Sequence, residues 1–306
     1  MSRPLTASVL RAARSAARQT RSINTHATPG SRTAASGASH TRVAVAAAVL
    51  LATGAGAYAL DKSELRAALP LIVDRYAIQC DAAPAPVDGD VKVDPATQVA
   101  HPLTLTPAST PALTLVGLGV RTVSFLSFKV YSAGFYVNDY VLRNSLHSLP
   151  GWSNFSATEI TGPAGEGMIQ ALLDSPADVA VRIVPFRNTD FSHLRDGFTR
   201  TLLARQKIQR QQGLLTPADD ERIATSLQAL KAMFPTGSVP KGNELIVTRS
   251  RDGKFGLEYK GKVLGTVADK WLADNMVLAY FDAKNSISPP LRASVAEGLE
   301  EFYQKK

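Results

Sequence analysis

Three stretches of the chain alternate between apolar and polar or small residues, as half-buried β-strands do. Two of them, residues 114–125 and 128–137, follow one another with a bend at Leu126 and Ser127. The third, PADVAVRIVPF, covers residues 176–186. The pattern predicts two consecutive paired strands and a third strand further along the chain.

Helical spacing follows the third strand. Over 189–210 the apolar positions repeat every three or four residues; they are Phe191, Leu194, Phe198 and Leu202. A second helix is expected from Thr216 to about Pro235. Its start has Pro217 in the first turn and Asp219 three residues after Thr216, the spacing of a capping box.

The last third of the chain predicts three short strands over 243–267, with turns at 251–253 and 260–261. Two more helices are expected over 268–281 and 288–306. Paired strands, two helices, a meander of strands and two helices indicate an α+β domain with an antiparallel sheet.

The N-terminal segment reads as a targeting sequence. Residues 1–23 are rich in Arg, Ser and Ala and lack acids, which is typical of a mitochondrial presequence; a disordered basic tail is the alternative.

Residues 43–60 carry no charge and span about 27 Å as a helix, just enough to cross a bilayer. With arginines on the N-terminal side, this run predicts an inner-membrane anchor and a domain in the intermembrane space. A matrix protein with a long Ala-rich leader is the alternative.

A helical and Pro-rich linker is expected over 61–97, so that the folded domain covers 98–306. The spacing of Asp88, Asp90 and Asp94 resembles a calcium loop. The run lacks the glycine and the final glutamate of such a loop, and we interpret these acids as solvated linker residues.

The net charge of +8 comes almost entirely from the N-terminus. Residues 1–60 contain seven arginines and no acid, and residues 61–306 contain 27 basic and 26 acidic residues. The folded part therefore lacks the basic surface of a nucleic-acid-binding protein. Cys80 is the only cysteine, which excludes an internal disulfide and a thiolate zinc cluster.

Arg121 is an unusual residue within the first strand pair. It is in phase with Val123 and Phe125 on one strand face. A guanidinium stays charged and needs a partner when it lies on an apolar face. The partner is either a ligand or a core carboxylate that serves fold specificity.

The chain shows none of the common catalytic motifs. Gly117 and Gly119 precede Arg121, but Thr122 stands where a dinucleotide site needs a third glycine, and a strand follows where that site needs a helix. There is no Walker loop, HExxH motif or GxSxG turn.

The stretches GVRTVSFLSFKVYSAGFYV and GLEYKGKVLGTVADKWLADNMVLAYF resemble the chalcone-isomerase-like family. With the helix after VPFRNTDF, the similarity covers about 114–306. The presequence and apolar run narrow it to the fungal mitochondrial branch named for altered inheritance of mitochondria. The resemblance implies a chalcone-isomerase-like open-faced β-sandwich, in which helices pack on an antiparallel sheet.

The resemblance also implies a site. Arg121 matches the arginine that stabilises the attacking phenolate in the plant enzyme, and Tyr131 takes the place of a hydroxyl residue. Phe191 and Phe198 align with a tyrosine and an asparagine of the enzyme. Their phenyl rings cannot replace those polar groups, so the chain is not expected to be a true chalcone isomerase. A further cavity residue of the penultimate helix could not be assigned.

An arginine with aromatic walls suits a hydrophobic anion, either haem or a fatty acid, and the resemblance permits both. We expect Arg121, Tyr131, Phe191 and Phe198 to bind it, with haem slightly favoured. His193 would then be the axial ligand of the haem iron, and His147 the fallback; no other cofactor is expected. The competing class is an intramolecular lyase that uses Arg121 and Tyr131. Expected partners are the small anion and the mitochondrial membrane, and no nucleic acid.

Overall fold

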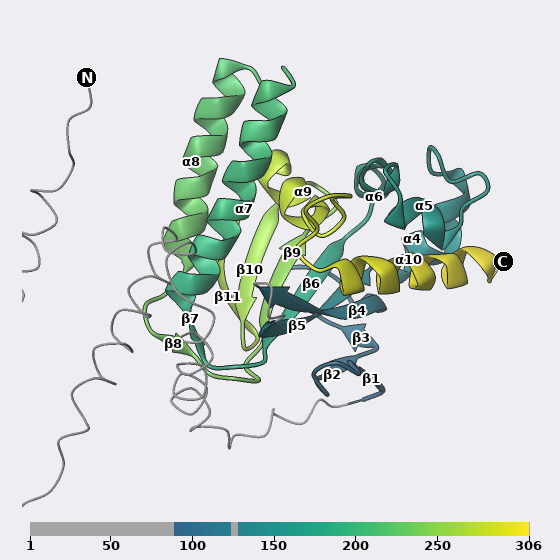
Figure 1. Ribbon diagram of the computed structural model, residues 1–306, viewed down its shortest axis with the longest axis horizontal. Helices are drawn as coiled ribbons and strands as arrows, with labels where there is room; N and C mark the ends of the chain where they lie inside the picture. The colour runs from purple at the N-terminus through teal and green to yellow at the C-terminus, as the bar shows by residue number, and fades with distance from the viewer. Residues whose placement is uncertain (1–88, 124–127, 306) are drawn as a thin grey trace, which may run out of the picture. The chain divides into compact units, whose positions relative to one another are not determined.

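The computed structural model describes residues 89–123 and 128–305, and Asp81–Lys306 forms one compact unit (Figure 1). The expected presequence (1–23) and membrane anchor (43–60) lie outside the described residues. Within the described part, no helix is both long enough and apolar enough to cross a membrane.

A seven-stranded sheet forms the centre of the unit, and every neighbouring pair of its strands is antiparallel. In sheet order, its strands are β11 (Lys262–Val267), β10 (Phe255–Tyr259), β9 (Leu245–Arg249), β6 (Val179–Pro185), β5 (Phe128–Val137), β4 (Leu113–Val123) and β3 (Thr104–Leu105). The strands expected from the alternating stretches are all present.

Two small antiparallel pairs lie outside this sheet. One joins β1 (Val91–Val93) to β2 (Ala100–Pro102), and the other joins β7 (Thr189–Asp190) to β8 (Ser238–Val239).

The four helices expected after the third strand are present in the predicted order, and four further helices lie between β5 and β6, where the sequence pattern made no prediction. They are α4 (Asp139–Asn144), the 3₁₀ helix η2 (Leu146–Ser148), α5 (Ala157–Thr161), α6 (Gly165–Asp174), α7 (Phe191–Gln211), α8 (Pro217–Met233), α9 (Lys270–Leu278) and α10 (Pro289–Gln304). The two long helices α7 and α8 run side by side (Figure 1). The expected capping box at the start of α8 is confirmed, because Asp219 N donates to Thr216 Oγ1 and Thr216 N donates to the Asp219 carboxylate.

The two faces of the large sheet are covered differently. One face packs against the helices in a large apolar cluster, which includes the predicted stripe of α7. The other face carries a small cluster made from strand residues alone: Leu105, Leu113, Leu115, Leu118, Tyr136, Ala180 and Ile246. The predicted α+β open-faced sandwich is therefore confirmed.

Helix α10 lies directly on β4 because two glycines remove the side chains between them. A Cβ atom added to Gly117 would lie 2.5 Å from the backbone nitrogen of Val295, and one added to Gly119 would lie 2.3 Å from that of Leu291. Ser288, the N-cap of α10, also donates to the Val120 carbonyl at 2.7 Å. The glycines that resemble a nucleotide-binding turn thus serve helix packing.

The expectation for residues 91–97 is wrong. Strand β1 lies inside the range assigned to a linker and pairs with β2, and Asp94, interpreted as a solvated acid, is 1% exposed. Its carboxylate accepts hydrogen bonds from the Ala96 backbone and from the Thr97 hydroxyl. These bonds satisfy an acid that the Pro-rich composition placed in solvent.

Candidate functional site

Arg121 lies near the end of β4, directly opposite Tyr131 of β5. Gly117, Gly119 and Arg121 alternate along β4, so Arg121 projects to the face on which α10 packs. Arg121 is half-buried, whereas Tyr131 is 2% exposed and belongs to the apolar cluster under the helices. The first strand pair therefore places a guanidinium at the border of the core.

Two tyrosine hydroxyls surround the guanidinium. Arg121 Nη1 donates to Tyr131 Oη at 3.4 Å, and Tyr131 Oη is 3.0 Å from Tyr280 Oη. Burial raises the pKa of Tyr280 well above its usual value, so its hydroxyl keeps its proton across the physiological range. The site thus combines one permanent cation with two neutral hydrogen-bonding hydroxyls.

The charge of Arg121 has an aromatic partner. Its guanidinium carbon lies 5.6 Å from the centre of the Tyr131 ring, a cation–π distance. Among the described residues no carboxylate forms an ion pair with Arg121. The described part of the chain therefore gives no support to the alternative in which Arg121 pairs with a core acid.

Tyr280 is the residue that sequence reasoning missed. It follows α9 and is 1% exposed, which fits the unassigned cavity residue of the penultimate helix. The signal is present in the run NMVLAYF, where a tyrosine follows buried helical positions. A buried tyrosine usually has a hydrogen-bond partner for its hydroxyl, and here that partner is Tyr131.

Phe191 and Phe198 lie in the core under α7. The Phe191 ring packs edge-on against Tyr259 of β10 at 4.9 Å, and the Phe198 ring packs against Phe234 at 5.9 Å. The first contact is to β10, and the second is to the C-cap residue of α8. Arg121 belongs to β4, which lies toward the opposite edge of the sheet from β10. Their expected role as ligand-binding residues stays a prediction.

The two histidines considered as haem ligands lie at the surface. The His193 side chain is 73% exposed and lies 3.8 Å from Asp190. The next residue, Leu194, lies on the buried face of α7, so His193 points away from that face. His147 stacks on Tyr303 of α10 at 4.0 Å. Both histidines are exposed, so the structure gives no support to His193 as the axial ligand of a haem iron, and that role stays a prediction.

A second polar cluster lies behind Tyr131, on the opposite face of the sheet. Arg182 Nη1 donates to His101 Nδ1 at 3.3 Å, and His101 Nε2 then donates to Ser132 Oγ at 2.8 Å. Ser132 in turn donates to Asp94 at 2.7 Å. The Arg182 guanidinium also pairs with Glu244 at 2.6 Å. Asp94, His101, Ser132 and Arg182 are buried and Glu244 is half-buried, and we call the cluster the back-face network.

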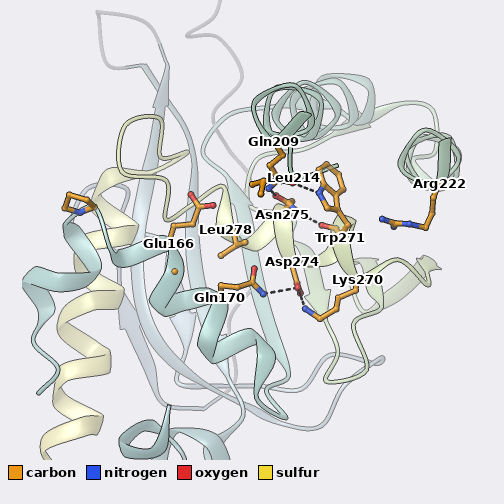
Figure 2. A pocket seen from close by; sticks show the side chains of 12 residues that line it. Glu166, Gln170, Gln209, Leu214, Arg222, Lys270, Trp271, Asp274, Asn275 and Leu278 are labelled. Carbon is orange, nitrogen blue, oxygen red and sulfur yellow. Dashed lines mark hydrogen bonds and ion pairs between the residues drawn. The ribbon is translucent and has the colours of Figure 1, made fainter. Parts of the chain in front are cut away.

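A pocket of about 780 Å³ opens between α6, α7, α8 and α9 (Figure 2). Its walls mix polar and apolar groups, and Lys270 pairs with Asp274 while Arg222 pairs with Asp269 at 2.6 Å. Trp271 donates to Gln209 at 2.7 Å across its floor. None of the residues predicted to bind the ligand lines this pocket. In the described residues, no group of acids, histidines or cysteines is arranged to hold a metal ion.

Comparison with known proteins shows which family the chain belongs to. The sequence profile of the family described as "Chalcone isomerase like" matches residues 111–296. "Altered inheritance of mitochondria protein 18, mitochondrial" of Lachancea thermotolerans is 30% identical over 82% of this chain and 86% of its own length. The protein of the same name in Debaryomyces hansenii is 31% identical over 60% of this chain and 65% of its own length.

Among solved structures, a fatty-acid-binding protein of Arabidopsis thaliana is similar, with a TM-score of 0.54 and 17% identity. The match covers 70% of this chain and all of that one. The curated relatives are mitochondrial by name, in agreement with the expected presequence. On the combined strength of the family profile and these relatives, the chain belongs to the chalcone-isomerase-like family.

Proposed function

We propose that the domain binds a hydrophobic monocarboxylate, such as a fatty acid, with its carboxylate on Arg121. The observation that carries the proposal is a half-buried guanidinium whose hydrogen-bond partner, among the described residues, is the hydroxyl of Tyr131. A guanidinium presents five N–H donors, which match the two oxygens of a carboxylate. Tyr280 extends the row of hydroxyls toward the apolar core.

The immediate surroundings favour an apolar ligand body. Tyr131 and Tyr280 both belong to the apolar cluster that fills the space between sheet and helices. A chain that follows them from Arg121 would therefore contact apolar groups, while its acid group remains at the border of the core. The shared fold of the Arabidopsis fatty-acid-binding protein supports this ligand class.

The sequence slightly favours haem over a fatty acid. Because the His193 side chain, the expected axial ligand, is 73% exposed, a fatty acid is the better candidate. Haem remains a proposal that one spectrum of the purified protein tests. A Soret band that weakens in the variant Arg121→Leu but not in His193→Ala would indicate haem held by its propionates alone. A colourless protein would leave the fatty acid.

The experiment titrates the purified protein with palmitate and with hexadecanamide, in competition with a dansylated fatty acid. The two ligands share the same chain, so their difference measures recognition of the carboxylate. We expect palmitate to bind at least about tenfold more tightly, because hydrogen bonds to charged groups contribute about 1.5–3 kcal/mol. Equal affinities would refute the assignment of Arg121.

Two variants sharpen this titration. Arg121→Leu should remove the preference for palmitate. Arg121→Lys keeps the charge but loses the planar fork, so we expect it to restore only part of the preference. Arg143→Leu is the matched control, because Arg143 lies in an exposed pair with Asp139 on α4. It should bind both ligands like the parent protein.

The second candidate is an intramolecular lyase, favoured by the hydrogen bond between Arg121 and a tyrosine hydroxyl. In that reaction Arg121 would stabilise developing negative charge on an oxygen, and Tyr131 would donate the hydrogen bond. Turnover of an added phenolic enone that is lost in both Arg121→Leu and Tyr131→Phe would establish it. Ligand binding without turnover would support a carrier.

We further propose that residues 43–60 anchor the chain in the mitochondrial inner membrane, with the folded domain in the intermembrane space. The support is the uncharged run and the arginines that precede it. Protease added to mitochondria with a ruptured outer membrane should then digest the domain. Protection under those conditions would place it in the matrix.

A further inference from the structure

The end of the β4–β5 hairpin where β4 ends and β5 begins carries exposed apolar residues with cations beside them. Val123 and Phe128 face each other across the two strands and are 44% and 38% exposed. Phe186, which follows β6, is half-buried beside them, because its backbone nitrogen donates to the Val130 carbonyl. With these three residues we group Lys129, Arg187 and Lys241 as the hairpin-end patch.

The cations of this patch lie over its aromatic rings. Lys129 Nζ and Lys241 Nζ are 5.7 and 5.4 Å from the centre of the Phe186 ring. The Arg187 guanidinium is 5.7 Å from the centre of the Phe128 ring. Three positive charges are thus held within one small apolar surface.

Acids do not neutralise these charges. In the described part of the domain, 11 of the 23 lysines and arginines form ion pairs, as Arg210 does with Asp220 and Arg251 does with Asp178. Within residues 89–123 and 128–305, no ion pair includes Lys129, Arg187 or Lys241. Because the domain is close to neutral as a whole, this local excess of positive charge is a feature of the patch.

We propose that the hairpin-end patch binds the surface of a membrane that contains anionic lipids. Exposed aromatic and aliphatic side chains enter the boundary between headgroups and acyl chains, and nearby Lys and Arg side chains attract anionic headgroups. A folded protein partner with an acidic surface would complement the three positive charges of the patch. It would not explain why the apolar side chains of Val123 and Phe128 are exposed beside those charges.

The patch is also close to Arg121. Along the hairpin, the pair of Val123 and Phe128 is followed by Thr122 and Lys129, and then by Arg121 and Tyr131. Two residues of strand correspond to about 7 Å. A membrane bound at the hairpin-end patch would therefore lie next to Arg121, the residue proposed to bind the carboxylate. The patch itself rests on exposed residues and does not depend on which ligand Arg121 binds.

The test measures membrane insertion at single positions in the full chain. Cys80, the sole cysteine, is changed to Ser, and an NBD dye is attached through Phe128→Cys or, as a second probe, Val123→Cys. Val263→Cys on β11 is the control, because Val263 is 41% exposed at the far edge of the sheet. Any binding through the basic N-terminus would affect all three proteins alike and cannot mimic insertion of the patch.

Vesicles of phosphatidylcholine with about one-third phosphatidylglycerol should increase and blue-shift the NBD emission at 128 and 123 but not at 263. The double variant Arg187→Glu/Lys241→Glu should raise the lipid concentration for half-maximal response by more than about tenfold. Lys207→Glu/Lys262→Glu, which makes the same change in net charge at exposed positions, should leave it unchanged.

Three results would overturn the proposal. One is an equal response, or no response, at positions 128 and 263. Another is insertion that both double variants weaken equally, since the effect would then follow net charge alone. The third is a change in emission that depends on protein concentration without vesicles, which would indicate that a second copy of the chain covers the patch.

Discussion

Neighbouring residues of β5 belong to two polar clusters with opposite properties. Tyr131 points to the helix-covered face and contacts Arg121, whereas Ser132 points to the other face and joins the back-face network. In the network each hydrogen-bonding group meets another, and the positive end at Arg182 is matched by Glu244. At Arg121 the described partners are neutral hydroxyls.

The difference separates polar groups that hold the fold from polar groups left available for a ligand. The back-face network connects Asp94 and His101 of the N-terminal segment to β5 and β6, and its guanidinium is already paired with Glu244. An arginine at the border of the core, with neutral partners, retains the capacity to bind an anion. The predictions below test this division, beginning with the largest expected change.

Removing Arg182 should destabilise the protein strongly. The variant Arg182→Met leaves Glu244 and the Ala100 carbonyl without their donor. Breaking a fully buried ion pair typically costs about 3–5 kcal/mol, and because the Glu244 side chain is 30% exposed we expect a loss of about 2–4 kcal/mol. Urea unfolding measures the loss. Arg143→Met on α4, which breaks an exposed pair with Asp139, should change the unfolding free energy by less than about 0.5 kcal/mol. Similar losses in both variants would contradict a structural role specific to the network.

Acid should weaken the back-face network through His101. Burial and the charge of Arg182 lower the pKa of His101 to about 3, from 6.5 in the unfolded chain. Between these values the unfolded chain binds more protons, so stability falls as the pH drops from 6.5 toward 3. The loss approaches about 1.4 kcal/mol per pH unit within this window.

The variant His101→Gln should show a shallower loss of stability between pH 6.5 and 4.5, because glutamine does not titrate. Acidic residues titrate equally in both proteins, and the difference between the two slopes therefore isolates His101. Equal slopes in urea unfolding would mean that His101 takes up its proton normally in the folded protein.

The site face depends on the close contact of α10 with β4, so Gly119→Ala should destabilise the domain by about 1–3 kcal/mol. The added methyl group would overlap the Leu291 backbone, which cannot rotate away. Gly197→Ala in α7 is the control, since its Cβ would meet no atom within 4 Å. Alanine is the better helix former, and thermal unfolding should show a gain of about 0.5–1 kcal/mol.

Arg121→Leu should have the smallest effect on stability, within about 1 kcal/mol of the parent protein, while it removes the preference for carboxylates. Functional residues often contribute little to the fold, and leucine suits the apolar surroundings. If Arg121→Leu lowered the unfolding free energy as much as Arg182→Met does, Arg121 would be a residue that stabilises the fold. Urea unfolding of the two variants side by side decides the matter.

Sequence reasoning predicted every strand of the large sheet except β3, together with the helices α7, α8, α9 and α10, because their periodicity is strong and helix ends carry caps, as at Thr216 and Pro217. It did not predict the helices between β5 and β6. It also singled out Arg121, because a charge in an apolar strand stands out, whereas Tyr131 was proposed only from the family resemblance. It missed Asp94, since a Pro- and Asp-rich stretch has the composition of a linker whether or not a sheet buries it. The partners His101 and Ser132 lie up to 38 residues away, and single residues at such separations leave no periodic signal.

His193 shows another limit of the same reasoning. A family resemblance can identify a helix near a cleft, but a one-residue step along it changes the direction of the side chain by about 100°. Phe191 and Leu194 occupy the buried face, and His193 lies outside it. Tyr280 could be found only after the fold had brought the end of α9 to β5.

The contact of α10 with β4 also has a kinetic consequence. The hydrogen bonds between them join residues separated by 168 and 176 positions, so a very long loop must close before they form. Contacts of this kind are slow to form. During refolding, the hairpin with Arg121 and Tyr131 can pair early, but its helix-covered side is completed only when α10 docks. We expect carboxylate binding to appear in the last refolding phase, after most secondary structure has returned.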